Sequence, residues 1–362
     1  MARQARVHRL PMSGPADVSA IESLFASGEL APENIVAVLG KTEGNGCVND
    51  FTRGYAVQSL RAALAAHLPP ERIDALPMVM SGGTEGGLSP HWIVLSEQHR
   101  QVTGPGHRPA LAIASAVTRP LTPSEIGRAA QVSLVEEAVR GAMARAAIAH
   151  PDDVHYVQIK CPLLTSERIE QVAGDVATQD TLKSMGLSRG ASALGVARAL
   201  GEVTQVPDDA IGADWSLWSS RASASAGIEL MCCEIVVMGQ SQEWAGDLAI
   251  THSVMRDAID GPAVADILAT IAPGAPLQSQ ADRLVAVLAK AEASTDGTIR
   301  GRRHTMRDDS DISSTRHARG FVGGVLAGLT GLTELFVSGG AEHQGPDGGG
   351  PVAIIYRKDI SP

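Results

Sequence analysis

Three serines are the residues of this sequence best placed to do chemistry, because the same short pattern follows each of them. Every serine is followed by glycine or alanine, then by glycine, and a glutamate comes four residues after it. The copies are Ser81-Gly82-Gly83-Thr84-Glu85, Ser225-Ala226-Gly227-Ile228-Glu229 and Ser338-Gly339-Gly340-Ala341-Glu342. Before each serine come a lysine that ends an apolar run and then an arginine: Lys41 and Arg53, Lys160 and Arg189, and Lys290 with Arg316 or Arg319. The order lysine, arginine, serine thus occurs three times.

A serine paired with a lysine can act as a nucleophile if the lysine removes the hydroxyl proton. The amine must be neutral for this, so its pKa has to fall below the usual value of about 10.4. Burial and neighbouring cations both lower a lysine pKa. Backbone N–H groups of the glycine-bearing turns could stabilise a developing oxyanion, and arginines could hold carbonyl oxygens. The sets therefore indicate attack on a carbonyl carbon.

The recurrence suggests units arranged about a pseudo-threefold axis, with the three sets lining one site. Three separate sites are the alternative. Convergence would gather the lysines and arginines into a cationic pocket inside an anionic protein. Such a pocket would attract a small, acidic, electron-poor ligand.

Successive elements of each unit must position these residues. The pattern predicts a helix, a strand ending at the lysine, a glycine-bearing loop, a helix carrying the arginine, a strand ending at the serine and a closing strand. The opening helices are expected over residues 17–26, 133–149 and 263–271, and the closing strands over 111–116, 234–238 and 352–356. The predicted fold class is α/β: three pseudo-symmetric α/β repeat units around a central barrel-like core, with one active site on the pseudo-threefold axis.

The length of 362 residues agrees with several units, since one hydrophobic core rarely serves so long a chain. We expect repeat units over residues 1–105, 112–248 and 255–362, with the first boundary in the Gly- and Pro-rich segment 104–109. Aromatic residues make up only 3% of the chain, so smaller aliphatic side chains must fill the core.

Composition argues against two classes of partner. The formal net charge is −10, whereas nucleic acid binding needs a concentrated basic surface. No run of 18 apolar residues occurs, so we expect no membrane span.

The four cysteines have neither disulfide nor metal spacing, which favours a location in the reducing cytoplasm; they are Cys47, Cys161, Cys232 and Cys233. The motifs of nucleotide-binding loops are absent from the sequence, so we expect no nucleotide cofactor.

The sequence resembles the cyanuric acid hydrolase/barbiturase family along nearly its whole length. The stretches that carry the resemblance are residues 40–50, the Ser81 turn, 160–164, 188–195, 222–227, 302–306 and the loop 339–351. The resemblance implies a threefold pseudo-symmetric α/β fold whose three units enclose one central active site. It also implies hydrolytic opening of the triazine trione ring of cyanuric acid to carboxybiuret, which loses carbon dioxide to give biuret.

By this resemblance, Ser225 is the nucleophile and Lys160 its base, and the other two pairs bind substrate. The implied substrate-binding set is Arg53, Arg189, Arg319, Ser81, Ser338, Lys41, Lys290 and the backbone amides of Gly82, Ala226 and Gly339. Alignment on the preceding Thr or Ser favours Arg316 as the third arginine, whereas the family pattern favours Arg319. Thr315 lies where substrate preference is tuned in the family.

The resemblance further implies a homotetramer, no cofactor for catalysis, and a structural Mg²⁺. The implied ligands of this ion are Glu292, Ala341, Gln344, Gly345, Pro346 and Gly349. Independently of the resemblance, the glycine-rich segment 339–350 can turn its carbonyl oxygens inward, and hard cations bind such oxygen-rich loops.

Other functions stay open at this point. A barbiturase would open a pyrimidine trione instead of a triazine. A non-catalytic protein could hold small anions in its three glycine-rich turns and would not consume them. A serine amidase acting on linear amides would need only one lysine–serine pair.

Overall fold

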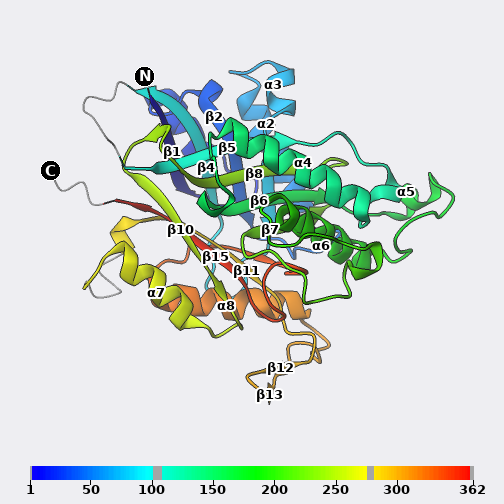
Figure 1. The fold of residues 1–362 in the computed structure, drawn as a ribbon. Helices are drawn as coiled ribbons and strands as arrows, with labels where there is room; N and C mark the ends of the chain where they lie inside the picture. Colours follow the sequence, from blue (N-terminus) through cyan, green and yellow to red (C-terminus); the bar gives the residue numbers. More distant parts are fainter. Residues whose placement is uncertain (1, 101–107, 275–280, 359–362) are drawn as a thin grey trace.

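Three main sheets, formed by the described residues and seen in Figure 1, share one strand order. The computed structural model describes residues 2–100, 108–274 and 281–358. The first sheet holds β1 (Ala2–Pro11), β2 (Ile35–Thr42), β3 (Met78–Gly82) and β4 (His91–Arg100); the second holds β5 (Ala110–Val117), β6 (Val154–Pro162), β7 (Ala222–Gly227) and β8 (Glu234–Ser241); the third holds β10 (Leu248–Met255), β11 (Leu284–Ala291), β14 (Phe336–Gly339) and β15 (Gly350–Arg357). When the four strands of each sheet are counted in chain order, their spatial order is third, second, fourth, first in every sheet.

The pairing within the sheets repeats as well. The second and third strands of each sheet run parallel, and the fourth pairs antiparallel with the first and the second. A register shift interrupts the second strand near its start in each sheet. The shifts fall between Ile35 and Ala37, between Val154 and Tyr156, and between Leu284 and Ala286. One topology with one shared irregularity confirms the predicted threefold α/β repeat.

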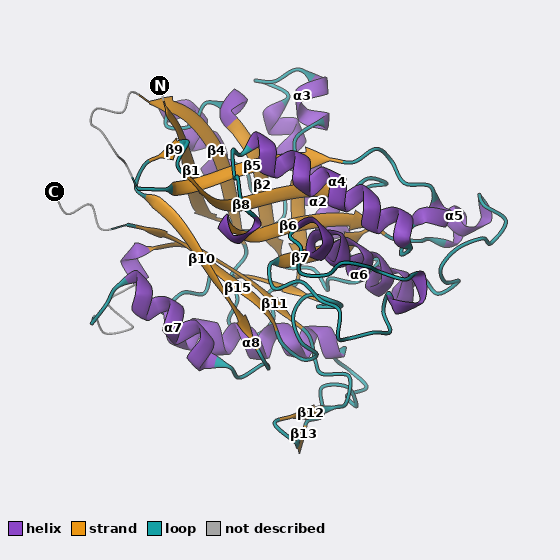
Figure 2. Ribbon diagram, viewed as in Figure 1, coloured by secondary structure: helices purple, strands orange, loops and turns teal. Residues whose placement is uncertain are grey.

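Two main helices accompany each sheet, and in Figure 2 the helices lie outside the strands. The helices before the lysine strands are α1 (Ser19–Ser27), α4 (Ala129–Arg145) and α7 (Gly261–Ile271), and those between the lysine and serine strands are α2 (Phe51–Leu64), α6 (Thr181–Ala199) and α8 (Ser314–Thr330). Short helices α3 (Pro70–Asp74) and α5 (Ser166–Glu170) complete the connections of the first and second sheets. Because a tight hairpin joins only antiparallel strands, the parallel lysine and serine strands need a crossover helix, and this helix carries the arginine.

Apolar side chains hold the three sheets together at the centre of the molecule. One buried cluster contains Val7 from β1, Leu111 from β5 and Leu288 from β11. The expected barrel-like core is corrected in one respect: among the described strands the sheets stay separate and do not close into a barrel. The one strand pairing that links them joins β9 (Trp244–Ala245), which follows the second sheet, to β1.

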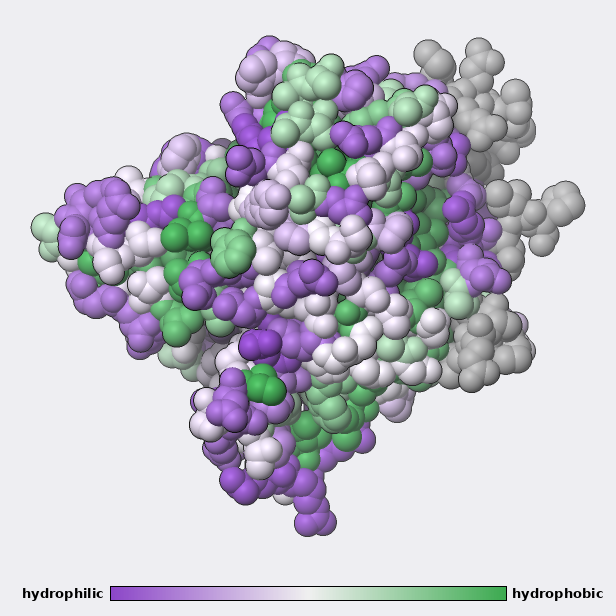
Figure 3. All heavy atoms as spheres, turned by 180° about the vertical axis from the view of Figure 1, so that it is seen from behind, coloured by the Kyte–Doolittle hydropathy of each residue, from purple (hydrophilic) through white to green (hydrophobic). Residues whose placement is uncertain are grey.

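The ribbon of β12 (Thr298–Ile299) and β13 (Arg302–Arg303) lies apart from the three sheets. Seen from behind, it belongs to a hydrophilic projection at the lower edge of the molecule (Figure 3). None of the helices in the described ranges is long and apolar enough to cross a membrane.

The expected order of elements was wrong at the start and end of the units. Each sheet begins with a strand, not with a helix; the expected helices correspond to α1, α4 and α7 but come second. The expected closing strand over residues 111–116 lies in β5, which pairs with β8 of the second sheet, and β4 closes the first sheet instead. Charged and polar residues hide two of the missed strands, since β1 reads ARQARVHRLP and β4 ends in SEQHR, and a third missed strand, β10, lies where a boundary between units was expected. The unit boundaries stay a prediction.

Candidate active site

Each lysine of the recurring sets lies directly beside a serine on the neighbouring parallel strand. The Cα partners are Lys41 and Ser81, Lys160 and Ser225, and Lys290 and Ser338. Paired residues project from the same face of a sheet, so each amine points to the same side as its hydroxyl. All six residues lie near the carboxyl ends of their strands, where crossover connections open into loops.

The backbone of the serine strands links the lysines into a ring. Each Nζ donates to the carbonyl oxygen of the residue that precedes a serine in another sheet. The donors and acceptors are Lys41 and Val337 at 2.6 Å, Lys160 and Met80 at 2.7 Å, and Lys290 and Ala224 at 2.8 Å. The hydroxyl oxygens of Ser225 and Ser338 are 2.8 Å apart. The three sets therefore meet at one place, and the alternative of three separate sites is wrong.

Lys41 and Lys290 are completely enclosed and hydrogen-bonded to their serines. Lys41 Nζ lies 3.3 Å from Ser81 Oγ, and Lys290 Nζ lies 3.2 Å from Ser338 Oγ. Burial holds the pKa of both amines well below the usual value, and a neighbouring arginine lowers each further. The lowered pKa shifts both side chains toward the neutral amine, which is the form that can accept a proton from a hydroxyl.

A glutamate of each serine turn meets an arginine from another sheet. The pairs are Glu85 with Arg319 (2.6 and 2.9 Å), Glu342 with Arg189 (2.6 and 2.8 Å) and Glu229 with Arg53 (3.7 Å). The site is therefore less cationic than expected, because every arginine has an anionic partner. No role was predicted for these glutamates, although their constant spacing from the serine could have indicated that they belong to the site.

Arg319, not Arg316, occupies the position equivalent to Arg53 and Arg189. Its side chain is 3% exposed, whereas that of Arg316 is 39% exposed. Arg316 lies one helical turn earlier on α8 and makes one hydrogen bond, of 3.1 Å, to the same Glu85. Alignment on the preceding Thr or Ser had selected the more exposed of the two residues.

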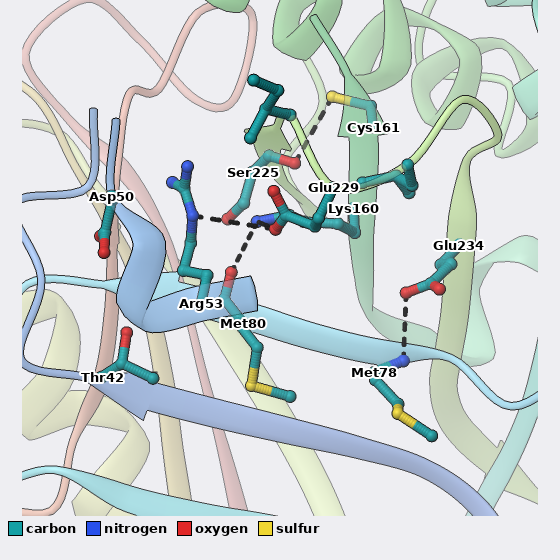
Figure 4. Close-up of polar contacts among 12 residues, drawn as sticks. Thr42, Asp50, Arg53, Met78, Met80, Lys160, Cys161, Ser225, Glu229 and Glu234 are labelled. Carbon is teal, nitrogen blue, oxygen red and sulfur yellow. Dashed lines mark hydrogen bonds and ion pairs between the residues drawn. The ribbon is translucent and has the colours of Figure 1, made fainter. Parts of the chain in front are cut away.

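The set of the second sheet differs from the other two (Figure 4). Glu229 Oε1 lies 2.8 Å from Lys160 Nζ, and its contact with Arg53 is the longest of the three glutamate–arginine contacts. Burial lowers the pKa of Lys160, but Glu229 acts in the opposite direction. Within the described structure Lys160 Nζ makes no hydrogen bond to Ser225, and the buried Nε of Arg53 has no hydrogen-bond partner.

The glycines of the serine turns are needed because arginines pack over them. Gly83 has φ +104° and Gly340 has φ +81°, values that side chains other than glycine rarely adopt. A Cβ at Gly83 would collide with the guanidinium of Arg319, and one at Gly340 would collide with that of Arg189. At Gly227 the collision would be with the carboxylate of Glu229, in keeping with the different set of the second sheet.

The backbone amides expected to bind substrate lie at the ends of the serine strands. Gly82, Ala226 and Gly339 pair with Thr42, Cys161 and Ala291 on the lysine strands. They follow the three serines directly, at the place where the sets meet. Their role as substrate-binding amides stays a prediction.

A cavity of about 310 Å³ lies beside Ala341 and Glu342 of the third serine turn, and its lining does not include the three lysines and serines. Its lining includes Arg189, Glu342, Glu292 and Thr315. The hydroxyl of Thr315 donates to Glu292 Oε2 at 2.8 Å, and its methyl lies where a Cβ on Gly339 would sit. Thr315 thus lies next to the serine turn of the third sheet.

Glu292 is the carboxylate in the implied Mg²⁺ site. Its side chain is half-buried, and partial burial together with the like charge of Glu342 raises its pKa. A bound cation would relieve both effects. The other implied ligands lie in a tightly folded loop, in which the Ala341 carbonyl accepts from Gln344 N and the Pro346 carbonyl from Gly349 N, both at 2.9 Å.

This donor set suits a hard cation, since carboxylate and carbonyl oxygens are the ligands that Mg²⁺ and Ca²⁺ prefer. The side-chain oxygen of one implied ligand already takes part in a hydrogen bond, because Gln344 Oε1 accepts from Ala224 N at 2.7 Å. The described residues contain no group of three or more His, Cys, Asp or Glu side chains that could hold a metal ion. The Mg²⁺ site therefore depends on backbone oxygens and stays a prediction.

Comparison with known families places nearly the whole chain in one group. The model of the family described as "Amidohydrolase ring-opening protein" matches residues 6–357. The chain is 55% identical over 361 residues to the cyanuric acid amidohydrolase of Azorhizobium caulinodans, covering 98% of this chain and 99% of that protein. It is 56% identical over 370 residues to the cyanuric acid amidohydrolase of Bradyrhizobium sp. (strain ORS 375), covering 98% of each.

Solved structures show the same similarity. The crystal structure of cyanuric acid hydrolase from A. caulinodans superposes with a TM-score of 0.92 at 54% sequence identity, covering 99% of this chain and all of that one. A second cyanuric acid hydrolase structure, described as an evolutionary innovation by structural concatenation, gives a TM-score of 0.95 at 47% identity, again with 99% of this chain covered.

Proposed function

The chain belongs to the ring-opening amidohydrolase family, and from that premise we propose that it hydrolyses the ring of cyanuric acid. The observation that carries this choice is the ring of three lysine–serine pairs around one centre. Cyanuric acid is itself threefold symmetric, so each equivalent set can meet one carbonyl group. A ring this small offers little apolar area, and its affinity must come from directed polar contacts.

In the proposed mechanism, Ser225 attacks one ring carbonyl carbon. Lys160, as the neutral amine, takes the hydroxyl proton as the Oγ–C bond forms, and the carbonyl oxygen takes up the negative charge. The ring C–N bond then breaks, and Lys160 returns the proton to the departing nitrogen. Water cleaves the resulting acyl-enzyme with Lys160 again as base. The product is carboxybiuret, which loses carbon dioxide to give biuret.

The remaining residues of the site bind and orient the ring. We assign substrate binding to Arg53, Arg189, Arg319, Ser81, Ser338, Lys41, Lys290 and the backbone amides of Gly82, Ala226 and Gly339. The amides and guanidinium groups hold the carbonyl oxygens, and they stabilise charge where it develops at the attacked carbonyl. Thr315, beside the third serine turn, is the proposed specificity residue.

The decisive experiment replaces Ser225, Ser81 and Ser338 with alanine one at a time and follows both biuret formation and binding of cyanuric acid by calorimetry. Ser225→Ala should abolish turnover and keep binding, whereas the other two variants should weaken binding first. General-base assistance alone is typically worth about 10² to 10⁴ in rate, and this contribution is lost when Ser225 has no hydroxyl. Normal turnover by Ser225→Ala would overturn the mechanism.

The choice of ring is tested separately. The proposal predicts turnover of cyanuric acid and little or none of barbituric acid. An enzyme that opened barbituric acid alone would be a barbiturase with the same catalytic set. A homotetramer is also part of the proposal, and sedimentation analysis of the purified protein measures it.

A further inference from the structure

The three serine-turn glutamates divide into two kinds, although they are related by the repeat. Glu85 and Glu342 each accept two short hydrogen bonds from an arginine. Glu229 contacts the lysine of its own sheet at 2.8 Å and leaves its arginine at 3.7 Å. The backbone of the turns differs in the same way, since Gly83 and Gly340 have positive φ and Gly227 does not.

We infer that Glu229 is the positioning residue that makes Lys160 and Ser225 the reactive pair. It holds the Lys160 amine through a direct contact of 2.8 Å and stays 3.7 Å from Arg53 Nε, which is left without a hydrogen bond and can bind substrate. The inference rests on the proposed function and deepens it, because it explains why one of three similar pairs would react.

The first effect concerns the base. A turn glutamate opposes the lowering of the pKa at all three lysines, but at Lys160 it does so through a direct contact of 2.8 Å between Glu229 Oε1 and the amine. A general base works best when its pKa lies near the working pH, because a weaker base has less driving force to take the proton. Glu229 thus keeps Lys160 a stronger base than the other two lysines.

The second effect concerns Arg53. Its Nη2 donates to the Cys47 carbonyl at 2.9 Å, but its buried Nε has no hydrogen-bond partner. A buried unpaired donor is costly, and a ligand oxygen would satisfy it. In Figure 4 the side chains of Arg53, Lys160 and Glu229 lie together beside Ser225, so this donor is close to the proposed nucleophile.

Other charged and titratable groups also surround Lys160. Arg53 on α2 and the Cys161 thiol on its own strand act on its pKa together with Glu229. Glu234 on β8 is the antiparallel partner of Lys160 and accepts a hydrogen bond from Met78 N at 3.0 Å. Burial raises the pKa of Glu234 to about 7, so this carboxyl must be separated from Glu229 in any pH experiment.

The test is the pH dependence of kcat/KM for cyanuric acid in Glu229→Gln, Glu234→Gln and Glu85→Gln. The acidic limb marks the loss of the proton from Lys160 in the free enzyme. Removing the negative charge of Glu229 disfavours the charged amine, so Glu229→Gln should move this limb to lower pH by about one unit or more and reduce kcat on the plateau. Glu85→Gln, the matched control, should raise KM and leave the limb in place.

Glu229→Asp keeps the charge but withdraws it from the amine, so it should move the limb in the same direction by less. This variant carries the test if Glu229→Gln does not fold. A limb unchanged in Glu229→Gln and Glu229→Asp, or one that moves in Glu234→Gln instead, would overturn the inference. Failure of the proposed function is a different result, namely turnover by Ser225→Ala.

Discussion

Glu85 and Arg319 lie 234 positions apart in the chain and are joined by two hydrogen bonds, of 2.6 and 2.9 Å. The glutamate follows the serine of the first sheet, and the arginine comes from the crossover helix of the third. This pair therefore links the first repeat to the third across the site. It also fixes the direction in which the guanidinium points.

Replacing Arg319 with lysine should raise KM without changing the fold. Lysine is a point charge and loses the two-pronged contact with Glu85. Hydrogen bonds to charged groups contribute about 1.5–3 kcal/mol, so KM should rise on the order of 10- to 100-fold. Steady-state kinetics with cyanuric acid measures this. Arg316→Lys is the control: it bonds the same carboxylate from a more exposed position and should change KM about twofold or less. Equal effects of the two substitutions would contradict the assignment of Arg319.

Gly83→Ala should lower both stability and affinity. The residue has φ +104°, and its Cβ would meet the Arg319 guanidinium. The backbone strain alone costs about 1–2 kcal/mol, and the arginine must move as well. Chemical unfolding and calorimetric binding measure the two effects. Gly328→Ala, in the exposed interior of α8 with no atom near its Cβ, should instead stabilise the protein by up to about 1 kcal/mol.

The lowered pKa of Lys41 predicts a pH dependence of stability. Below about pH 10 the unfolded chain binds the lysine proton more strongly than the folded protein does, so the free energy of unfolding rises with pH from the lowered pKa of the folded protein up to about pH 10. The contribution of one such lysine is at most about 1.4 kcal/mol per pH unit. Lys41→Met should therefore show a smaller rise in urea-unfolding experiments at neutral and alkaline pH, whereas replacement of the exposed Lys183 should leave it unchanged. An identical slope in Lys41→Met would show that the amine stays charged in the folded protein.

Removing a structural cation should lower Tm without abolishing the chemistry at the serines. The half-buried Glu292 carboxyl lies beside Glu342, and a cation would relieve the repulsion between them. Dialysis against a chelator should lower Tm, and Mg²⁺ should restore it. In Glu292→Gln both the chelator effect and the bound metal should be lost. Purified protein free of metal, with a Tm unaffected by the chelator, would rule out the predicted ligand set.

The recurring motifs were enough to predict the threefold repeat and the lysine–serine pairing within each sheet. Parallel pairing of the strands that end at Lys160 and Ser225 follows from their order and from the helix between them. The strands β1 and β4 were missed because their charged residues, such as Arg3 and Glu97, interrupt the alternation of apolar side chains. These two residues pair with each other at 2.6 Å, a contact that no local pattern reveals.

Contacts between sheets were also beyond the sequence. The reach of Lys160 to the Met80 carbonyl and the choice of Glu229 between two cationic partners depend on how the sheets pack. A motif gives the residue types at a site. It does not show in which copy of the repeat the glutamate contacts the lysine instead of the arginine. The asymmetry of the second set could therefore be seen only in three dimensions.

The ring of lysine contacts has a sense of rotation. Lys41 of the first sheet reaches the third, Lys290 of the third reaches the second, and Lys160 of the second reaches the first. A planar molecule bound at the centre of this ring of contacts would lie in a chiral environment, so its two faces would not be equivalent. The proposed attack by Ser225 would then come from one face only, even though the ring itself has no handedness.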